Sequence, residues 1–311
     1  MGVEIAIFDL LLEPRSEGVP HGHYLGSALR GAFGRCLKRT VCIVPQGECA
    51  HCPLQTHCPY VYLFETPGEG RPSPFGLETA PHPFVICPPG PLEPETIPLE
   101  VRLVLIGRAV SFLPHVLWSF HRLCQAGLGA ERRRYALASV VARTESGPCP
   151  IWSPGDPTIH LSGFHAQKLE PGATPLGEVS SVRLSFVTPL RIRHERRLCT
   201  RLTFPILMTN ILRRLYLLEQ YHGDGKWELD HRALIAAADE VQCLEYRLLW
   251  YDWTRYSSRQ ETKMQLGGLI GTVTFAGKLG PFLPFLKAAE LVHVGRNTSF
   301  GLGRMVIQEI S

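Results

Sequence analysis

The residues with the clearest metal-binding chemistry in this sequence are four cysteines within one short stretch. They are Cys42, Cys49, Cys52 and Cys58, with the spacing C-x6-C-x2-C-x5-C. Four thiolates this close together suit tetrahedral zinc, and a loop with little apolar content would gain its order from the metal. The C-x2-C-x5-C part, with proline after two of its cysteines, also fits an iron–sulfur cluster. We predict a structural metal on these four cysteines, zinc or alternatively an iron–sulfur cluster, with free thiols as the plainer alternative.

A second chemical signal is a glycine-rich segment near the C-terminus, HVGRNTSFGLGR at residues 293–304. Glycine lets the backbone take positive φ and approach a ligand closely, and exposed amides can hold phosphate oxygens. The segment lies between a predicted helix and the last predicted strand, whereas a dinucleotide-binding loop follows a strand and opens a helix, and no GKS or GKT follows it. We expect either a phosphate-contacting loop or a tight turn that simply requires glycine.

The basic residues are the third signal. The net charge is only +4, which does not by itself indicate a polyanionic partner. Their distribution is more informative, because clustering on one face is what phosphate binding requires. Solvated surface faces are the alternative. The basic clusters lie at residues 30–39, 132–134, 191–201 and 255–263.

Composition limits the cellular setting. The 311 residues, 45% of them hydrophobic, allow one large domain or two ordinary ones. The sequence has neither an apolar run long enough to cross a membrane nor a basic signal-peptide opening, so we predict a soluble, cytoplasmic protein with no membrane partner. In a reducing compartment, clustered cysteines more often hold metal than form disulfides.

The elements that would position these residues follow from apolar periodicity. In the first half, Leu25, Leu29, Phe33 and Leu37 recur every four positions and predict a helix over 24–39. A second helix is predicted at 111–124. Strands are predicted at 3–12, 60–64, 83–87, 99–107 and 135–143.

The pattern recurs after a proline- and glycine-rich stretch at 148–177. The predicted elements there are strands at 181–192, 241–256, 264–275 and 304–310, with helices at 204–221 and 281–291. We therefore predict an α+β protein of two tandem ferredoxin-like (RRM-like) domains, each an antiparallel sheet backed by two helices. The N-terminal domain, 1–147, carries the cysteine-rich loop at 42–58. A connecting segment at 148–179 leads to the C-terminal domain, 180–311, with the glycine-rich loop.

The sequences of several segments resemble those of a known family. HVGRNTSFGLGR resembles the C-terminal glycine-rich signature of RAMP-superfamily proteins, and among them CRISPR-associated endoribonucleases of the Cas six type. RYSSRQ at 255–260 with GGLIG at 267–271 resembles the strand pair preceding that signature, and LGSALRGAFG at 25–34 resembles the first helix. The resemblance covers both halves and is strongest in the C-terminal third.

The resemblance implies cleavage of CRISPR repeat RNA without a catalytic metal. The 2′-hydroxyl upstream of the scissile bond attacks the phosphate and leaves a cyclic phosphate. Such a reaction needs a general acid or base, cations around the crowded phosphate, and in-line positioning of the attacking hydroxyl. Partners would be the repeat RNA and possible further Cas subunits of an effector complex.

The family places its acid or base near the start of the first helix, where His23 and Tyr24 stand in this sequence. Histidine exchanges protons near neutral pH. We therefore assign His23, Tyr24 and Arg30 as catalytic candidates. The alternative is that His21 and His23 are an N-capping or surface pair before the helix. The rival histidines are His121, His165 and His293.

The remaining cations and glycines are assigned to RNA contacts, with surface salt bridges as the alternative for the cations. An A-form stem is expected to be recognised by its shape, phosphates and ends. The RNA-binding candidates are Lys38, Arg255, Arg259, Lys263, Gly295, Arg296, Gly301, Gly303 and Arg304.

Two other function classes remain open at this point. A non-catalytic RAMP subunit would bind guide RNA inside an effector complex without cutting it. A metal-dependent nuclease or redox enzyme using the cysteine loop is weaker, since no Asp/Glu cluster with metal-ligand spacing accompanies it in the sequence.

Overall fold

The computed structural model describes most of the chain. The described residues are 2–15, 24–44, 47–66, 71–73, 76–78, 80–91, 93, 97–129, 131–169, 178–195, 197–252, 254–257 and 262–311. They divide into two compact units. Gly2–Leu169 with Leu217–Gly225 form the N-terminal unit, and Glu170–Tyr216 with Lys226–Ser311 form most of the C-terminal unit.

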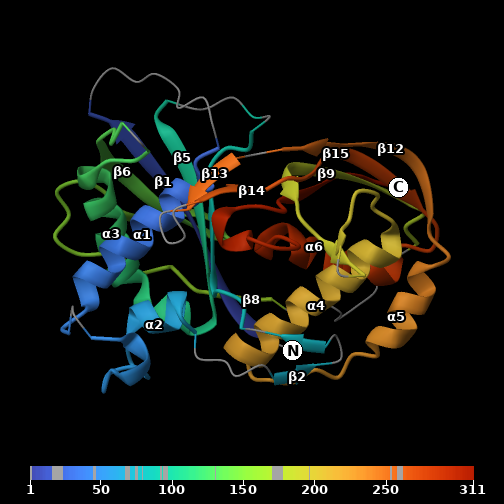
Figure 1. Ribbon diagram of the computed structural model, residues 1–311, viewed down its shortest axis with the longest axis horizontal. Helices are drawn as coiled ribbons and strands as arrows, with labels where there is room; N and C mark the ends of the chain where they lie inside the picture. The colour runs from blue at the N-terminus through green and yellow to red at the C-terminus, as the bar shows by residue number, and fades with distance from the viewer. Residues whose placement is uncertain are drawn as a thin grey trace. The chain divides into compact units, whose positions relative to one another are not determined.

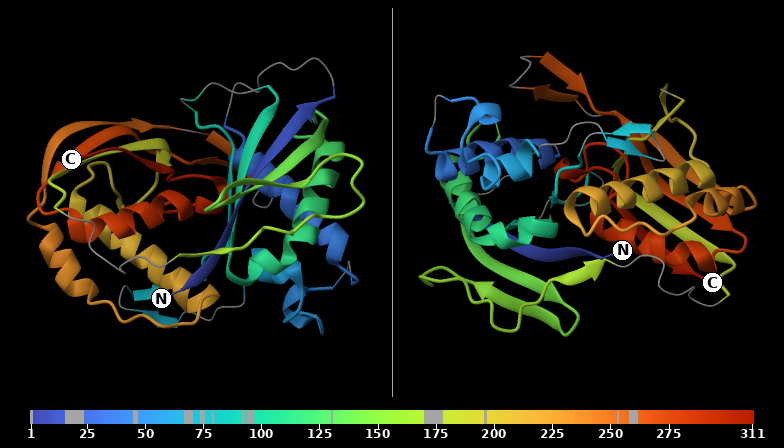
Figure 2. Two further views of the ribbon diagram at one scale, coloured as in Figure 1. Left: turned by 180° about the vertical axis from the view of Figure 1, so that it is seen from behind. Right: turned by 90° about the horizontal axis from the view of Figure 1, so that it is seen from below.

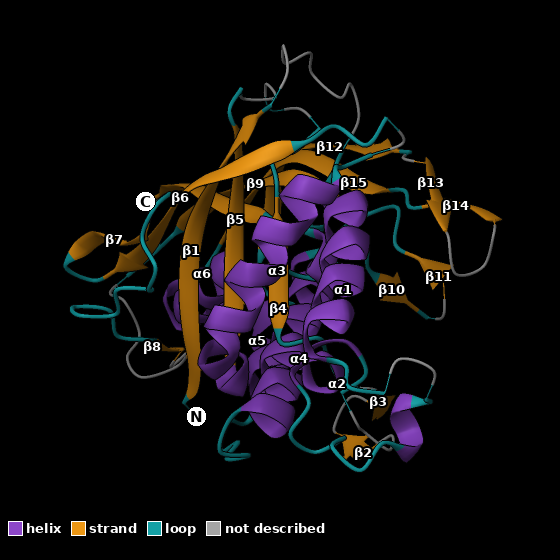
Figure 3. Ribbon diagram, turned by 90° about the vertical axis from the view of Figure 1, so that its left-hand side faces the viewer, coloured by secondary structure: helices purple, strands orange, loops and turns teal. Residues whose placement is uncertain are grey.

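The N-terminal unit is an antiparallel sheet with two helices packed on one face (Figures 1 and 3). The strand order is β4-β5-β1-β6-β7, and β8 pairs with β1 beside this path. The order β4-β5-β1-β6 with intervening helices is that of a ferredoxin-like fold. The strands are β1 (Val3–Pro14), β4 (Phe84–Cys87), β5 (Leu99–Ile106), β6 (Tyr135–Thr144), β7 (Gly147–Trp152) and β8 (Gln167–Leu169), with a small separate hairpin of β2 (Arg71–Ser73) and β3 (Gly76–Glu78). The helices are α1 (Gly26–Val41), α2 (Pro59–Phe64) and α3 (Leu113–Ala126).

The alternating side chains of β1 show which face of the sheet the helices cover. Phe8, Leu10 and Leu12 belong to the same buried cluster as Leu29 and Phe33 of α1. Successive strand residues point to opposite faces, so the helices cover the face that carries the even-numbered residues of β1. The Phe33 and Phe120 rings stack at 5.1 Å and join α1 to α3.

The C-terminal unit repeats this plan. Its sheet has the order β12-β15-β9-β16, and α4 and α6 cover one face (Figures 1 and 2). Phe204 at the start of α4 contacts Phe275 of β15 and Phe282 before α6, with ring centroids 5.1 and 5.0 Å away. The helices are α4 (Phe204–His222), α5 (His231–Ala238) and α6 (Leu283–Val292). The strands are β9 (Ser181–Leu190), β12 (Gln242–Tyr251), β15 (Gly268–Ala276) and β16 (Met305–Ile310), with the hairpins β10 (Arg193–His194)–β11 (Arg197–Leu198) and β13 (Thr254–Ser257)–β14 (Thr262–Gln265).

The predicted α+β class with two ferredoxin-like sheets is confirmed, but several elements differ. Residues 60–64 form helix α2 and not a strand; Pro59 occupies its first turn, where the fixed φ of proline favours a helix start. The long strand predicted at 241–256 ends at Tyr251, and β13 is a separate strand paired with β14.

The border between the units also differs from the predicted one. The segment predicted as a connection at 148–179 supplies most of β7 and all of β8 to the N-terminal sheet. Leu217–Gly225, which follow in the second half of the sequence, group with the N-terminal unit. Among the described residues, no helix combines the length and apolar content needed to cross a lipid bilayer.

Candidate nucleic-acid interface

The first helix carries two of the predicted cations, and both lie over aromatic rings of α2. The guanidinium carbon of Arg30 is 5.0 Å from the Phe64 ring centroid, and Nζ of Lys38 is 5.2 Å from the Tyr60 ring centroid. Tyr60 and Phe64 stack on each other at 5.4 Å, as residues one helical turn apart can. The two cations therefore link α1 to α2 through cation–π contacts.

Arg30 also fixes a histidine that sequence analysis missed. Its Nη2 lies 2.9 Å from Nε2 of His82, and because a guanidinium can only donate, Nε2 of His82 accepts. His82 stacks against Phe84 at 5.8 Å. Only the fold brings this residue, 52 positions away in the sequence, beside Arg30.

The other catalytic candidates lie just before α1. Tyr24 is buried, with 5% of its surface exposed, so its ring is anchored in the N-terminal unit. His23 lies outside the described residues. Of the rival histidines, His165 is exposed, whereas His121 stacks on Trp118 at 5.2 Å and bonds Gln125 through Nε2 at 2.9 Å.

The glycine-rich loop does lie between α6 and β16, as predicted, and much of its backbone bonds internally. The amides of Gly301 and Gly303 donate to the carbonyls of Thr298 and Pro189 at 2.8 and 3.1 Å. A Cβ on Gly303, where φ is +70°, would lie 1.8 Å from the Val294 carbonyl oxygen. A Cβ on Gly295 would lie 2.6 Å from the Arg191 carbonyl oxygen. Glycine is thus needed here for close packing of the loop on itself and on the end of β9.

His293 is a structural member of this loop. It is 3% exposed, and its Nδ1 lies 3.2 and 3.3 Å from the carbonyls of Gly301 and Leu302. Since carbonyls only accept, Nδ1 carries the proton. Burial lowers the pKa of His293 to about 3, with the charges of Arg304 and Arg214 adding to the decrease. The ring is therefore neutral near pH 7 and is poorly suited to exchange protons with a substrate.

Arg214 of α4 binds the end of α6, directly before the same loop. Its Nε and Nη2 donate to the carbonyl of Val292, the last residue of α6, at 3.3 and 3.1 Å. A cation at a helix C-terminus binds otherwise unbonded carbonyls and interacts favourably with the helix dipole. Burial lowers the pKa of Arg214 to about 10, so it stays charged at neutral pH.

Three arginines of the C-terminal unit lie beside the glycine-rich loop. Burial lowers the pKa of Arg191, and the nearby charges of Arg296 and Arg193 lower it further. The Arg296 amide donates to the Arg191 carbonyl at 2.8 Å, and Nη1 of Arg191 donates to the Gly267 carbonyl at 2.8 Å. Like charges held this close together suit a polyanion. Of this trio, only Arg296 was predicted individually; the run at 191–201 was the signal for the other two.

The remaining predicted contacts lie near the loop in sequence or in the hairpin after β12. The Arg304 amide donates to Oγ1 of Thr188 at 2.8 Å. Arg255 lies in β13, opposite Met264, and Lys263 lies in β14, opposite Tyr256. Arg259 lies outside the described residues.

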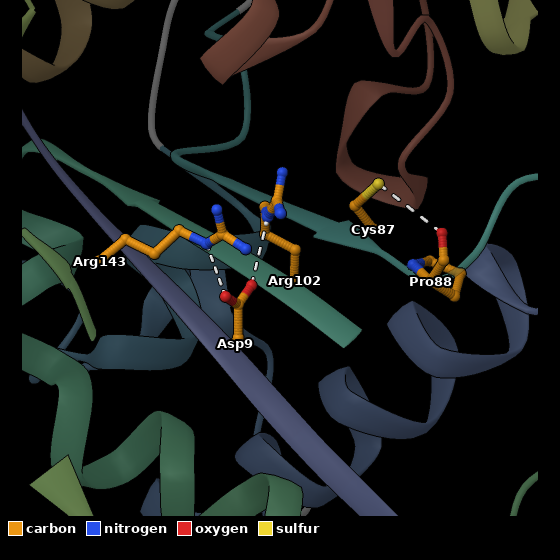
Figure 4. Close-up of polar contacts among 5 residues, drawn as sticks. All are labelled: Asp9, Cys87, Pro88, Arg102 and Arg143. Carbon is orange, nitrogen blue, oxygen red and sulfur yellow. Dashed lines mark hydrogen bonds and ion pairs between the residues drawn. The ribbon is translucent and has the colours of Figure 1, made fainter. Parts of the chain in front are cut away.

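The N-terminal sheet has a charged group on the face away from α1 and α3. Asp9 of β1 accepts from Nε of Arg102 at 3.3 Å and from Nε of Arg143 at 2.5 Å (Figure 4). One carboxylate facing two guanidinium groups leaves this group of three with a net positive charge. The three side chains are 37–51% exposed, so each pair adds little to stability.

The four predicted metal ligands lie around the connection from α1 to α2. Cys42 follows α1, Cys58 precedes α2, and Cys49 opens a 3-10 turn that ends before Cys52. In the described part of the chain, no three cysteine, histidine or acidic side chains are placed so that they could hold one ion. All four cysteine residues nevertheless line one cavity of about 250 Å³.

Comparisons with known proteins match a different family model to each half of the chain and identify a shared fold. The family model for CRISPR-associated endoribonuclease Cas6 matches residues 184–305. The AF_1859_N family model, described as an N-terminal domain, matches residues 3–163, about half of the chain, so the N-terminal half belongs to that domain family. A protein of Archaeoglobus fulgidus described as uncharacterized is 24% identical over 90% of both chains.

Solved structures show the same architecture at low sequence identity. The Cas6 of Thermus thermophilus superposes with a TM-score of 0.57 at 16% identity, covering 98% of this chain and 99% of that one. A Cas6 product complex gives a TM-score of 0.58 at 17% identity, covering 98% and 100%. At these identities the likeness establishes the fold.

Proposed function

We propose that this chain, which belongs to the CRISPR-associated endoribonuclease Cas6 family, cuts the repeat RNA of a CRISPR precursor transcript to give mature guide RNA. The solved Cas6 structures that resemble it include a product complex and a substrate-mimic complex. Internal cleavage of RNA, rather than degradation from an end, is the activity that the description of the family as an endoribonuclease supports.

The proposed reaction uses the RNA itself as the nucleophile and no catalytic metal. The upstream 2′-oxygen forms a new bond to phosphorus while the bond to the 5′-oxygen of the next nucleotide breaks. A base takes the 2′-hydroxyl proton and an acid protonates the departing 5′-oxygen, so the products are a 2′,3′-cyclic phosphate and a 5′-hydroxyl. The enzyme contributes proton transfer, charge stabilisation and in-line positioning.

His23 is the proposed proton-transfer group. An imidazole has an unperturbed pKa of about 6.5 and serves as acid or base at neutral pH. The neighbouring Tyr24 is buried, which suits a positioning role for the segment that carries His23. Arg30, eight positions before Lys38 on α1, would add positive charge on the same helix.

The cation cluster beside the glycine-rich loop is the observation that most favours RNA as the ligand. Arg193 and Arg296 are close enough to Arg191 to lower the pKa of its guanidinium group, in addition to the effect of burial. That arrangement is unfavourable by itself and becomes favourable when phosphates lie between the guanidinium groups. We propose that the close-packed loop shapes this surface, while the side chains of the three arginines and Arg304 contact the RNA backbone, and that the β13–β14 hairpin also belongs to the RNA-binding surface.

The test is cleavage of the repeat RNA that neighbours the gene, in excess EDTA. Product with a cyclic phosphate supports the proposal, and a 2′-deoxy substitution before the scissile phosphate should abolish it, because the nucleophile is then absent. Persistent cutting of the deoxy substrate would overturn the chemistry. Tight binding with no product in EDTA or in Mg²⁺ would instead favour a non-catalytic RAMP subunit that holds guide RNA in an effector complex.

A further inference from the structure

The connection between α1 and α2 is anchored at both ends but has little core of its own. Phe33 and Phe64 pack with centroids 5.4 Å apart and hold the two helices together. Between them, the 3-10 turn at Cys49–His51 has no buried residue. Three large apolar side chains of the same stretch are exposed: Ile43 by 70%, Val44 by 42% and Leu54 by 44%. Apolar burial alone therefore gives this segment little compensation for the entropy lost on ordering it.

The four cysteines occupy the positions from which a metal would hold this segment. The Cys42 amide donates to the Lys38 carbonyl at the end of α1, and the Cys58 carbonyl accepts from Tyr62 in the first turn of α2. Cys49 and Cys52 are joined by a Cys52 N–H to Cys49 C=O bond of 3.3 Å, which closes the turn between them. Two thiols thus come from helix ends and two from a tight turn.

All four cysteine residues line the same cavity of about 250 Å³. Among the described residues, no three histidine, cysteine or acidic side chains are placed so that they could hold one metal ion. A cysteine thiol can be redirected by rotation about χ1 between staggered positions, which requires no movement of the backbone. Lys38 also lines the cavity, and its charge would offset part of the negative charge of four thiolates around a divalent ion.

We propose that Cys42, Cys49, Cys52 and Cys58 bind one structural Zn²⁺ that ties the end of α1 to the start of α2. Zinc with four thiolates is tetrahedral, and closely spaced C-x2-C pairs are typical of such sites. The overall spacing C-x6-C-x2-C-x5-C differs from the C-x2-C-x2-C and C-x4-C-x2-C runs of common iron–sulfur proteins. The site is separate from the proposed cleavage chemistry, so it stands or fails independently.

The first experiment measures metal in the wild-type chain. The protein is expressed with both zinc and iron supplied, purified without a metal-affinity step, and analysed for both elements. We expect about one zinc per chain, and a mercurial thiol reagent should release it as four thiols react. Less than a tenth of an equivalent of zinc, zinc release without thiol modification, or a brown protein with several irons per chain would each overturn the proposal.

The second experiment uses matched serine variants. Cys49→Ser with Cys52→Ser should lose the zinc and lower the melting temperature by several degrees. Cys243→Ser, an exposed cysteine of the C-terminal unit, makes the same chemical change outside the cavity and should keep both zinc and melting temperature. If the double variant is insoluble, Cys58→Ser replaces it and should show reduced zinc occupancy. Full zinc retention in a soluble cavity variant contradicts the proposed ligand set.

Discussion

Tyr62 and His222 are 160 positions apart in the sequence, yet Oη of Tyr62 lies 3.0 Å from Nδ1 of His222. Nε2 of the same histidine lies 2.7 Å from the carbonyl oxygen of Pro81. Because a carbonyl only accepts, Nε2 carries a proton, and when the ring is neutral its Nδ1 accepts from the tyrosine hydroxyl. The end of α4 is thereby bonded to α2 and to the residue that precedes His82, all within the N-terminal unit.

Removing the tyrosine hydroxyl should weaken this attachment. Tyr62→Phe is expected to lower the free energy of unfolding by about 1 kcal/mol, the usual net value of a hydrogen bond. Chemical denaturation of Tyr62→Phe, His222→Ala and the double variant forms a cycle that isolates the pair. A coupling energy near zero would show that the contact contributes nothing to stability.

Contacts of this kind mark the limit of what the sequence could predict. Apolar periodicity located α1 through Leu29 and Phe33, and β9 through alternating buried residues, because a covered face leaves a regular pattern. The run at 60–64 was too short to distinguish a strand from a helix, and Pro59 settles it only once α1 is present for α2 to pack on. No local pattern could pair Arg30 with His82, or Tyr62 with His222.

Some features of the candidate site were likewise predictable from the sequence, and others were not. The glycine-rich motif and the arginine run at 191–201 were visible in the sequence because their composition is unusual. The internal role of Gly303 was not, since it depends on the Val294 carbonyl oxygen that its α-carbon approaches. The neutral state of His293 likewise depends on burial, which a motif does not report.

Gly303→Ala should be strongly destabilising. The new Cβ would lie 1.8 Å from the Val294 carbonyl oxygen, so the loop would have to shift, whereas Gly163, with φ at +85°, has no atom within 4 Å of an added Cβ. Positive φ alone costs a non-glycine residue about 1–2 kcal/mol. Gly163→Ala should therefore lose about that amount and Gly303→Ala clearly more, as measured by urea unfolding. Equal losses would refute the close-packing argument.

His293 should make stability depend on pH. Its folded pKa of about 3 lies below the ordinary value of 6.5, so the unfolded chain binds the proton more readily. The stability contributed by the neutral ring is fully present above about pH 6.5 and is lost as the pH falls toward about 3. Within that window each pH unit costs up to about 1.4 kcal/mol.

The check is unfolding in denaturant at pH 7.5, 6 and 5. Wild type should lose stability more steeply than His293→Asn, which retains a neutral N–H donor but does not titrate. His165→Asn, a change at an exposed histidine, should follow the wild-type profile. Parallel profiles for wild type and His293→Asn would show that another group controls the acid response.

His23→Ala should lower the single-turnover cleavage rate by roughly a hundredfold or more, the usual effect of removing a general acid or base. RNA affinity should be nearly unchanged, because the lost group acts on protons. His160→Ala, a change at an exposed histidine that is not a catalytic candidate, serves as the control and should cleave normally. A near-wild-type rate for His23→Ala would transfer the role to another histidine, and His82, held by Arg30 at 2.9 Å, is the next candidate to replace.

Arg193→Gln and Arg296→Gln should weaken RNA binding through lost phosphate contacts. Both charges lie close enough to Arg191 to lower its pKa, so each substitution removes one charge from the same cluster. Each lost contact should reduce the slope of log affinity against log salt concentration by about 0.7–0.9. The loss should be similar for cognate and scrambled RNA, because phosphate contacts carry no sequence information.

The control is Arg232→Gln, at an exposed arginine on α5. It removes the same charge elsewhere and should change the slope little. If all three variants lower the RNA affinity equally, net charge rather than this cluster determines binding. If only Arg193→Gln and Arg296→Gln lower it, the RNA phosphates bind beside the glycine-rich loop.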